Sequence, residues 1–567
     1  MTKRMPTRRT KKPISRMPRK VRRRPKVLFV IGGVLSGVGK GTAVSSIGRI
    51  LLAQGYRVAA MKIDPYLNVD AGTMNPTEHG EVFVTIDGLE TDQDLGNYER
   101  FLGIETTRAH YMTLGQVYQT VIQRERNLGY GGKCVEPFYH IPLEIIARIE
   151  RLQRTSRAEI ILIEVGGTVG EYQNLVFLEA ARILHRKTPE DVQFLLVSYL
   201  PIPSKVGEMK TKPTQHAVQM LHSAGIQPDF VLGRSARPLD QRRKEKISLL
   251  CDIDVENVIS APDVDSIYDI PLNLDREHVG QKILRGFGLT PRSRELTEWR
   301  GLVRRISAAK RDVRIAIVGK YFATGSFTLT DSYISVIEAI KHAAWVHHAK
   351  PVIDWLDAEV FEQSASAREQ LASYDGVLVP GGFGSRGVEG KIAAIEYVRT
   401  HRIPYFGLCY GMQLAVIEFT RHVLKRTNAS TTEVHPDTPD PVIDVMASQK
   451  EKLAKRLYGG TMRLGGYRCT LTRGSIAADA YGTRTVVERH RHRYEVNEKY
   501  RDALERRGLH ITGVNPETGL AEIIELAEHP FFLGTQFHPE FQSRPLAPHP
   551  LFVEFLRASV KRAKTRP

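Results

Sequence analysis

The chain has 567 residues, of which 42% are hydrophobic and 25% charged, and this length predicts two to four domains of ordinary globular composition. No apolar run is long enough to span a membrane, and the arginine-rich start is unlike a secretory signal. The four cysteines are far apart and lack CxxC spacing, which argues against a disulfide framework or a zinc site, so we expect a cytoplasmic protein.

Most of the net charge of +18 lies at the start of the chain. Residues 1–26 contain 13 Lys or Arg and no acidic residue, which leaves +5 for the other 541. Because residues 1–25 also contain four prolines and few apolar side chains, we predict a disordered basic tail. Solvation alone explains such a tail; attraction to RNA, ribosomes or anionic surfaces and organellar targeting are the alternatives.

From Val27 onward, short apolar runs alternate with longer amphipathic ones, a pattern typical of an α/β fold with a mostly parallel sheet. Strands are predicted at 26–31, 58–63, 160–165, 192–199 and 230–232. The first is followed by the glycine-rich loop GGVLSGVGKG and then by a helix from about Lys40. The sequence thus predicts a strand, a tight loop and a helix in direct succession.

This loop, residues 32–41, has the composition of a phosphate-binding loop. Its glycines leave backbone N–H groups pointing at one spot, at the positive end of the helix dipole, and Lys40 adds a charge for the terminal phosphates. The spacing departs from GxxxxGK[ST], because Gly33 is one residue early and Gly41 replaces the usual metal-binding hydroxyl. A generic tight turn therefore stays an alternative.

Two acidic residues strengthen the phosphate interpretation. Glu164 ends an apolar strand at the carboxyl edge of the predicted sheet, where α/β proteins bind ligands, and Asp94 lies in a polar segment, 91–94. Mg²⁺ prefers one or two carboxylates together with phosphate oxygens, so this pair predicts a magnesium site. The alternative is that both carboxylates only cap helices or bind lysines.

A second phosphate contact is predicted further along the chain. Lys210 and Lys212 are one residue apart, so in an extended segment they face the same side and could contact a second polyphosphate. A solvated loop is the simpler interpretation.

Pro291 and several Arg and Lys interrupt the alternation, and a second α/β pattern then begins with strands at 313–318, 376–379 and 405–408. We therefore expect five parts in chain order: a basic tail (1–25), a first domain (26–288), a linker (289–312), a second domain (313–560) and a short basic C-terminal tail (561–567).

The sequence GLCYG around Cys409 follows an apolar strand and is typical of a nucleophile elbow. The helix predicted after it favours a thiolate. His538 and Glu540 are two residues apart, so in an extended segment the glutamate could orient the imidazole beside Cys409. The glycine-rich residues 380–384 follow another strand and could supply an oxyanion hole. Together these elements predict acyl-transfer chemistry.

Other residues with possible chemistry are interpreted more simply. Cys134, Cys251 and Cys469 are expected to be small buried hydrophobic residues. The run HRHR at 490–493 could suggest a metal, but its arginines disfavour a second cation, so recognition of a carboxylate is expected.

Over nearly all of residues 27–558 the chain resembles the CTP synthase family, the glutamine-hydrolysing amidoligases. The motifs that carry this resemblance occur in family order and are GGVLSGVGKG, MKIDPYLNVDAGTM, HGEVFV, IEVGGTVGE, KTKPTQH, DVDSIY, VPGGFGSRG, GGTMRLG, VERHRHRYEVN and QFHPEF. The resemblance implies a P-loop, dethiobiotin-synthetase-like parallel-sheet domain followed by a class I glutamine amidotransferase α/β domain.

The resemblance also implies the reaction. ATP would phosphorylate O4 of UTP, and ammonia released from glutamine would pass through the protein and displace that phosphate to give CTP. Elementary chemistry agrees with this order of steps. The C4 oxygen is a poor leaving group until it is phosphorylated, and ammonia is mostly protonated in neutral water, so it should be made and used inside the protein. Mg²⁺, activation by GTP, feedback inhibition by CTP, homotetramers and filaments are implied in the same way.

The resemblance assigns site residues by motif. In the first domain these are Ser36, Gly37, Val38, Gly39, Lys40, Gly41 and Asp94 for ATP, with Lys62 near the transferring phosphate; Asp94 and Glu164 for Mg²⁺; and Ser36, Glu171, Tyr172, Gln173, Lys210, Lys212, Gln215 and Lys246 for UTP or CTP. In the second domain they are Cys409, His538 and Glu540 for catalysis; Gly382, Tyr410, Gly411, Met412, Gln413, Glu433 and Arg493 for glutamine; and Arg463 for activation by GTP.

The chain departs from the family pattern at several positions. Where the family has Asp, any residue, Glu, this chain has Glu171, Tyr172 and Gln173, which puts CTP inhibition in doubt. Tyr410 replaces a more common Leu, and residues 322–330 contain an extra stretch. A cobyrinic-acid-type amide synthase would share the loop and the elbow but should lack KTKPTQH and DVDSIY. A structural or RNA-associated protein should have lost Lys40, Cys409 or their partners.

Overall fold

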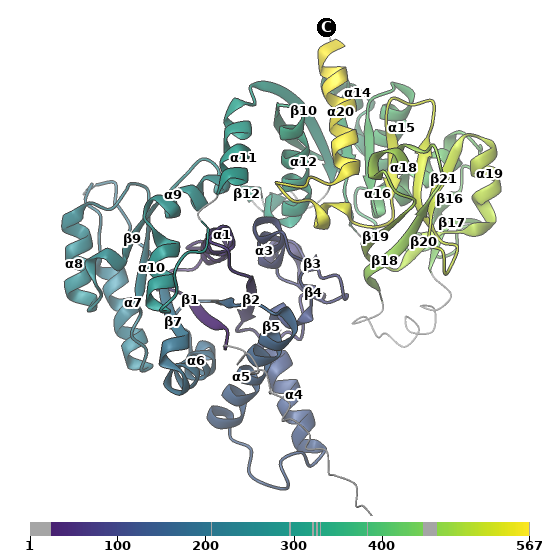
Figure 1. The fold of residues 1–567 in the computed structure, drawn as a ribbon. Coiled ribbons are helices and arrows are strands. Elements are labelled where there is room, and N and C mark those ends of the chain that lie inside the picture. Colours follow the sequence, from purple (N-terminus) through teal and green to yellow (C-terminus); the bar gives the residue numbers. More distant parts are fainter. Residues whose placement is uncertain are drawn as a thin grey trace, which may run out of the picture.

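The computed structural model describes residues 24–205, 207–293, 296–319, 323–324, 327–328, 330–382, 384–445 and 462–565. The predicted N-terminal tail thus lies outside the described residues except for its last two, and the extra stretch at 322–330 is described only in part. The described chain forms two α/β bodies side by side, each built on its own sheet (Figure 1).

The first body is built on a parallel sheet in which seven described strands follow the order β5-β2-β6-β1-β7-β8-β9. Its strands are β1 (Lys26–Gly32), β2 (Val58–Asp64), β5 (Tyr111–Thr113), β6 (Ile160–Val165), β7 (Val192–Tyr199), β8 (Phe230–Ser235) and β9 (Val258–Pro262). Because helices cover both faces, these strands are buried on both sides and appear in the sequence as continuous apolar runs.

Alternate residues of β1 separate the two cores of this body. Val27 and Phe29 pack toward one set of helices, and Leu28 and Val30 toward the other. The helices of the first face are α4 (Leu114–Arg126), α5 (Pro137–Ser156), α6 (Leu175–Lys187), α7 (Lys212–Ser223) and α8 (Gln241–Cys251). Those of the second face are α1 (Lys40–Ala53), α3 (Asp94–Leu102), α9 (Ile270–Arg276), α10 (Val279–Gly286) and α11 (Thr297–Ala308).

The segment predicted as a linker, 289–312, contains helix α11. Trp299 and Leu302 of this helix are buried in the core of the first body, and the indole of Trp299 donates a hydrogen bond to the carbonyl of Tyr268 over 2.8 Å. The connection is therefore packed against the first body for most of its length.

The second body is built on a mixed sheet of nine described strands, in the order β13-β10-β14-β15-β23-β22-β21-β18-β19. The first five are parallel and the rest antiparallel. The strands are β10 (Arg311–Gly319), β13 (Ala349–Asp357), β14 (Gly376–Val379), β15 (Tyr405–Leu408), β18 (Arg463–Leu471), β19 (Thr485–His492), β21 (Leu509–Val514), β22 (Ala521–Leu526) and β23 (Phe532–Thr535).

Helices cover both faces of this sheet as well. One face carries α12 (Ile334–Val346), α18 (Ile476–Tyr481) and α20 (Pro550–Thr565); the other carries α13 (Ala358–Gln363), α15 (Val388–Thr400), α16 (Tyr410–His422) and α19 (Arg501–Arg506). Since α20 continues to Thr565, most of the predicted C-terminal tail, 561–567, is helical. The predicted combination of a parallel-sheet domain and a second α/β domain is confirmed.

Smaller elements connect or flank the two bodies. They are α2 (Pro76–His79), β3 (Phe83–Val84), β4 (Glu90–Thr91), β11 (Ala323–Thr324), β12 (Phe327–Thr328), α14 (Ala365–Glu369), β16 (Ala429–Thr431), β17 (Asp440–Val445) and β20 (Tyr494–Val496). The β3–β4 hairpin extends from the first body toward β18 and β19 of the second (Figure 1). Among the described residues, no helix has the length and apolarity needed to cross a bilayer.

Candidate active sites

The glycine-rich loop joins β1 to α1 at the carboxyl edge of the first sheet, as predicted. Gly37 and Gly39 have φ values of 68° and 80°, a left-handed conformation in which glycine carries no steric penalty. Ser36 and Gly37 are exposed, whereas the amine of Lys40 folds back on the loop and donates a hydrogen bond to the carbonyl of Gly167 over 2.6 Å. Burial lowers the pKa of Lys40.

Lys62, on β2, lies at the centre of a group of carboxylates beside this loop. Its amine donates hydrogen bonds to Asp94, at the start of α3, and to Glu164 on β6, the latter over 2.9 Å. Asp64 and Asp92 lie within 3.8 and 3.9 Å of the same nitrogen. Burial by itself lowers the pKa of Lys62, but these four negative charges outweigh it and raise the pKa well above its usual value.

Gly41 explains one departure from the standard loop. A Cβ atom placed on Gly41 would lie 2.1 Å from Oδ1 of Asp94, so only glycine lets α1 approach this carboxylate so closely. The position that usually carries a metal-binding hydroxyl is therefore occupied by the side chain of Asp94.

The two predicted metal ligands, Asp94 and Glu164, converge on one point, and that point is held by the ammonium of Lys62. Among the described residues, no group of three or more His, Cys, Asp and Glu is arranged to hold a metal ion. Two carboxylates that are completed by phosphate oxygens are, however, the donor set that Mg²⁺ prefers, so the residues fit this ion together with a nucleotide.

The residues predicted to bind a pyrimidine nucleotide lie in two surface segments. Lys212 is the first residue of α7, so the expectation of an extended segment around it was wrong; Pro213 in the first helical turn is the reason. The amine of Lys210 forms an ion pair with Glu208 at 2.6 Å. The amide of Gln215 bonds within the first turns of α7, and Lys246 is exposed on α8.

The second segment follows Gly170. Glu171 accepts hydrogen bonds from the backbone N–H of Thr168, over 2.7 Å, and from the amide of Gln173, over 2.9 Å. Tyr172 is 88% exposed. The side chain that departs from the family pattern, Gln173, thus turns back to its neighbour Glu171.

Cys409 lies between β15 and α16, as predicted for a nucleophile elbow. Its φ of 49° and ψ of −97° are strained for a residue with a side chain, and such conformations cost on the order of 1–3 kcal/mol. The flanking glycines permit the turn, because a Cβ atom on Gly407 would lie 2.7 Å from the hydroxyl of Tyr405, and one on Gly411 2.2 Å from the carbonyl of Val379. The amide of Gln536 donates to the sulfur over 3.6 Å.

His538 and Glu540 contact each other as predicted, with 2.7 Å between Nδ1 and Oε1. They are not in an extended segment, which corrects that expectation: His538 precedes a single 3₁₀ turn, Pro539–Gln542, and this turn brings the carboxylate back to the imidazole. Burial by itself lowers the pKa of His538, but the charges of Glu540 and Cys409 raise it to about 10. Nε2 of His538 is buried and, among the described residues, has no hydrogen-bond partner.

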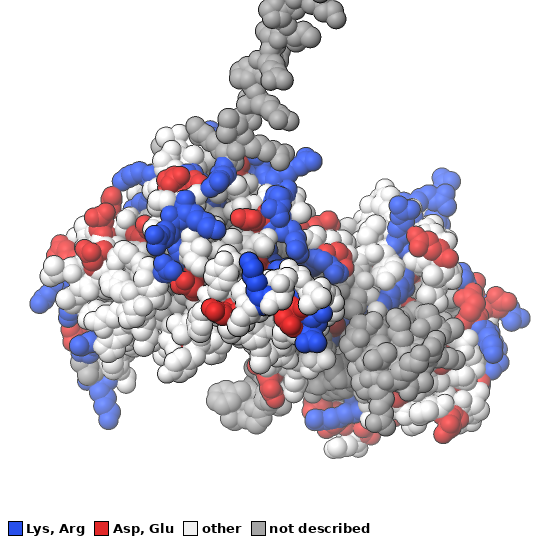
Figure 2. Space-filling view, turned by 90° about the horizontal axis from the view of Figure 1, so that it is seen from below, with Lys and Arg blue, Asp and Glu red and all other residues white. Residues whose placement is uncertain are grey.

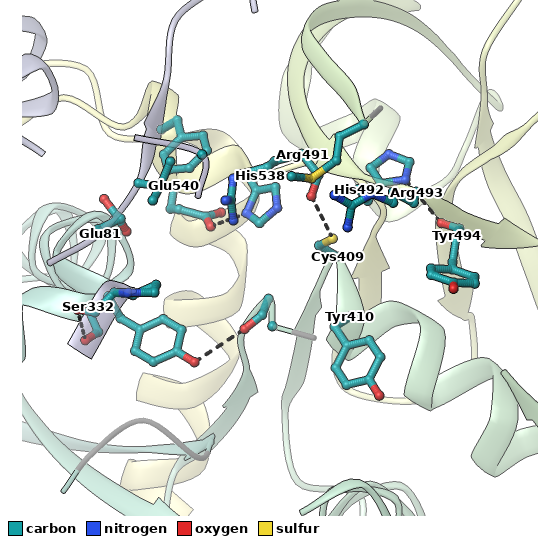
Figure 3. A pocket seen from close by; sticks show the side chains of 18 of the residues that line it. Glu81, Ser332, Cys409, Tyr410, Arg491, His492, Arg493, Tyr494, His538 and Glu540 are labelled. Carbon is teal, nitrogen blue, oxygen red and sulfur yellow. Dashed lines mark hydrogen bonds and ion pairs between the residues drawn. The ribbon is translucent and has the colours of Figure 1, made fainter. Parts of the chain in front are cut away.

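These residues line a cavity of about 320 Å³ (Figure 3). Five of the seven predicted glutamine-binding residues also line it: Gly382, Tyr410, Gln413, Glu433 and Arg493. Gly411 and Met412 are not in this lining and lie in the first turn of α16 behind Cys409. Glu433 accepts a hydrogen bond from the backbone N–H of Gly384 over 2.9 Å, and Gln413 donates one to the carbonyl of Tyr494 over 2.9 Å.

The first body supplies part of the same cavity. Its contribution comes from the segment before β3: Gly72, Thr73, Pro76, Glu81 and Val82. Glu81 is held by α12 of the second body, where both the N–H and the hydroxyl of Ser335 donate to its carboxylate. Burial raises the pKa of Glu81 to about 7. The cysteine site therefore opens onto residues of the other body.

The structure also describes the surroundings of Arg463 and of the three cysteines outside the elbow. Arg463 is buried and binds Glu495 and Glu522 at 3.3 and 2.7 Å, so its guanidinium is already paired inside the second body. Cys134 is exposed, not buried, whereas Cys251 and Cys469 are buried as expected.

The side chains of residues 490–493 have different surroundings. Arg491, His492 and Arg493 all line the cavity, and the guanidinium of Arg491 also pairs with Glu90 on β4 at 2.8 Å. The backbone carbonyl of Arg491 lies 3.9 Å from the sulfur of Cys409. One residue of β19 therefore contacts both the nucleophile and the other body.

The contact between the two bodies also contains a buried charge cluster that the sequence analysis missed. Arg489 and Glu99 are fully buried and lie 3.0 Å apart, and Arg544 donates to the same carboxylate. Arg489 also donates to the carbonyl of Val84 on β3 over 3.1 Å. Arg489 lies in the motif VERHRHRYEVN, which was the only signal for it.

Two known protein families match this chain, one in each of the two bodies. Residues 26–289 match the family described as CTP synthase N-terminus, and residues 328–558 match glutamine amidotransferase class-I. The CTP synthase of Carboxydothermus hydrogenoformans is 49% identical over 95% of this chain and 99% of its own. The CTP synthase of Chloroflexus aurantiacus is 50% identical over 94% of this chain and 96% of its own. A solved Trypanosoma brucei CTPS glutaminase domain with bound acivicin is 39% identical, covers 44% of this chain and 94% of its own, and has a TM-score of 0.41.

Proposed function

The chain belongs to the CTP synthase family and forms CTP from UTP in an ATP-dependent reaction with glutamine as nitrogen donor, and from this premise we propose how its residues divide the work. The second body releases ammonia from glutamine, and the first activates UTP and consumes the ammonia. The observation that carries this proposal is the cavity that begins at Cys409 and is lined, at its other side, by residues of the first body.

In the proposed glutaminase step, the sulfur of Cys409 attacks the side-chain amide carbon of glutamine. His538, held by Glu540, carries the proton that leaves with ammonia and then activates the water that hydrolyses the thioester. The backbone N–H groups of Gly382 and Tyr410 face the developing oxyanion. A buried imidazolium next to the sulfur supports this assignment, because it favours the thiolate.

We assign the amino-acid end of glutamine to three side chains that line the cavity, Gln413, Glu433 and Arg493. Arg493 supplies a positive charge for the α-carboxylate, and Glu433 a negative one for the α-ammonium. Gly411 and Met412 act from behind, by holding the first turn of α16.

In the proposed synthetase step, the N–H groups of residues 36–41 and the amine of Lys40 hold the phosphates of ATP. Asp94 and Glu164 would hold Mg²⁺, which when bound neutralises phosphate charge during transfer. Lys62 now donates to Asp94 and Glu164, the two carboxylates that would hold Mg²⁺. We therefore propose that Lys62 leaves these carboxylates and contacts the transferring phosphoryl group instead. O4 of UTP accepts the phosphoryl group, and ammonia then displaces it.

We propose that UTP, and CTP as inhibitor, bind between the basic residues Lys210, Lys212 and Lys246 with Gln215, and the segment Glu171–Gln173. Ser36, exposed at the tip of the loop, would contact the same nucleotide. Because the two segments lie on the surface, a homotetramer that joins them across subunits is the proposed assembly. Filaments and a cytoplasmic location are proposed from the family alone, and contact with nucleic acid through residues 1–25 from their charge.

GTP is proposed as an activator. We propose that Arg463 acts indirectly, through its ion pairs with Glu495 and Glu522. These pairs hold in place the strands that carry the cavity residues 491–493. Met462, next to Arg463, lines the cavity.

The division of labour is tested by two substitutions in one spectroscopic assay of UTP conversion to CTP. Cys409→Ala should abolish glutamine-dependent synthesis and leave synthesis from added ammonia. Lys40→Ala should abolish synthesis from both nitrogen sources while glutamate release persists. Loss of both activities in each variant would contradict separate sites, and measuring the same assay with and without GTP tests activation.

A further inference from the structure

Gln536 lies directly behind the nucleophile, and the glutaminase step assigns it no role. It opens the motif QFHPEF, which also carries His538 and Glu540. Its side chain is fully buried, and its amide nitrogen Nε2 lies 3.6 Å from the sulfur of Cys409. Since Gln536 does not line the cavity, it reaches the sulfur from the protein side and leaves the space for the substrate free.

The backbone fixes the position of Gln536 relative to the sulfur. Gln536 directly follows β23, and its N–H donates to the carbonyl of Glu522 on β22 over 2.8 Å. The carbonyl of the residue before it, Thr535, accepts a hydrogen bond from the N–H of Cys409 over 2.6 Å. Both partners of the contact are therefore tied to the strands of the second sheet.

The orientation of the Gln536 amide follows from its neighbours. Nε2 of Gln413 donates to the backbone carbonyl of Tyr494 over 2.9 Å, and a carbonyl oxygen only accepts. The same nitrogen lies 3.2 Å from Oε1 of Gln536, so the oxygen end of Gln536 must face Gln413. The nitrogen end then faces the sulfur of Cys409. Reversing the amide would place two donors against each other.

A neutral donor suits this buried position. On the face that Figure 2 shows, Lys, Arg, Asp and Glu are exposed at the surface of the molecule. A lysine or arginine buried behind Cys409 would have to lose its hydration, whereas an amide donates an N–H at a much lower cost. The amide also donates at every pH, unlike the imidazole of His538, the titratable group that interacts with the sulfur from the cavity.

The other backbone group near the sulfur does not supply a donor. The carbonyl of Arg491 lies 3.9 Å from the sulfur of Cys409 and can only accept (Figure 3). Gln536 therefore stabilises negative charge on the sulfur whether or not His538 carries its second proton.

We propose that Gln536 is a further catalytic residue of the glutaminase, whose amide N–H stabilises the thiolate of Cys409. The inference rests on the proposed attack by Cys409. When the thiolate attacks, the bond from Sγ to the amide carbon of glutamine forms, and the carbonyl electron pair moves to the oxygen. When the thioester is hydrolysed, that bond breaks and its electron pair returns to the sulfur, beside the same N–H. Gln536 thus stabilises the thiolate before attack and again as the leaving group, and no proton passes through it.

The rate of alkylation of Cys409 by iodoacetamide, measured as a function of pH, reports the thiolate directly. Gln536→Met removes the amide at nearly the same volume, and Gln363→Met, at an exposed glutamine at the end of α13, is the matched control. Every protein compared also carries Cys134→Ser, because Cys134 is exposed, whereas Cys251 and Cys469 are buried. The labelled peptide that contains Cys409 is followed by mass spectrometry.

In Gln536→Met the pH of half-maximal alkylation should rise by about one to two units, the size expected for a hydrogen bond to a charged group. The plateau rate at high pH should not fall, because a less stabilised thiolate is the better nucleophile. A disturbed site would instead lower the plateau. Gln363→Met should match the protein that carries Cys134→Ser alone. An unchanged midpoint in Gln536→Met, or the same shift in both variants, would overturn the proposal.

The kinetics of glutamate release separate this role from substrate binding. In Gln536→Met, kcat at pH 7 should fall at least about tenfold, since a hydrogen bond to a charged group is lost, while KM for glutamine changes less than about threefold. A higher KM at unchanged kcat would assign Gln536 to substrate binding and refute the proposal. Glutamate release by Cys409→Ala would instead remove the premise, and the alkylation midpoint does not depend on turnover.

Gln536→Met is accepted as folded when it forms CTP from added ammonium. If it does not fold, Gln536→Asn replaces it, because asparagine keeps a buried amide but is one methylene shorter, so its N–H no longer reaches the sulfur. The alkylation midpoint of Gln536→Asn should also rise by about one unit. A midpoint equal to that of the control would contradict the role of Gln536.

Discussion

The proton on His538 depends on two neighbouring residues, Glu540 and Cys409. Glu540 lies 2.7 Å from its Nδ1, and together with Cys409 it raises the pKa of the imidazole from 6.5 to about 10. Because the folded value is the higher one, the stabilisation from this proton is complete below pH 6.5 and is lost as the pH rises toward 10.

The substitution Glu540→Gln removes the charge that raises the pKa of His538 the most. We expect the pKa of His538 to fall, so that the alkaline loss of glutaminase activity begins at lower pH than in the unaltered protein. The pH profile of glutamate release measures this shift. Glu517→Gln, an exposed acid in the same body, is the control, and identical profiles for both variants would refute the role of Glu540.

Gln173 lies in the segment proposed to bind CTP as an inhibitor, so it bears on feedback regulation. Its amide bonds to Glu171 over 2.9 Å, where the family pattern has a second carboxylate, so one negative group that would face the pyrimidine is missing. We expect inhibition by CTP to be weak or altered and Gln173→Glu to strengthen it. Titration of CTP against the rate of synthesis measures this, and potent ordinary inhibition of the unaltered protein would contradict the expectation.

At the scale of elements, the phosphate loop depends on the contact between α1 and α3. The substitution Gly41→Ser places a Cβ atom 2.1 Å from Oδ1 of Asp94, so the carboxylate must move. A displacement of about 1 Å at a reacting centre can cost on the order of a hundredfold in rate. Synthesis of CTP from glutamine and from ammonia should fall together, with glutamate release intact.

Gly301→Ser provides the matched control for this substitution. It adds the same side chain to a helical glycine of α11 with no atom within 4 Å of the new Cβ. It should leave both activities unchanged. Equal rates for Gly41→Ser and Gly301→Ser would show that the close approach of Asp94 has no part in the synthetase step.

The elements that the sequence predicts well are those whose signal is local. Buried parallel strands such as β1 and β6 appear as uninterrupted apolar runs, and the glycines at 37 and 39 and around Cys409 mark turns that other residues resist. The spacing of Lys210 and Lys212 suggests an extended segment, but Lys212 begins a helix, and Pro213 in its first turn is the local signal for that helix. The partner of Arg463 could not be predicted, because Glu522 is 59 positions away on another strand.

At the scale of the whole molecule, the two bodies are joined by charges that no local pattern reveals. Glu99 of α3 binds Arg489 and Arg544, which are 390 and 445 positions away. Burial raises the pKa of Glu99, but the two guanidinium groups outweigh burial and lower it below its usual value. Its contribution to stability is therefore present above its unfolded pKa and lost as the pH falls through the lower folded value.

The substitution Glu99→Gln leaves two buried arginines without a counter-charge. Breaking a buried ion pair from one side costs about 3–5 kcal/mol, so the urea midpoint should fall markedly. Glu505→Gln, which breaks a partly exposed pair with Arg501, should cost no more than about 1 kcal/mol. Similar midpoints for the two variants would show that the cluster does not hold the bodies together.

The arrangement of the two bodies allows a direct test of the proposed transfer of ammonia from one body to the other. In the proposed scheme, ammonia made at Cys409 enters a cavity that is lined in part by Val82 and Glu81, which belong to the body proposed to consume it. The direct test supplies glutamine labelled with ¹⁵N in its amide together with an excess of unlabelled ammonium, and measures the label in the new amino group of CTP. We predict that most of the CTP carries the label, and that Val82→Trp, which narrows the cavity, reduces this fraction while glutamate release continues. Label diluted to the composition of the bulk solution in the unaltered protein would contradict transfer inside the molecule.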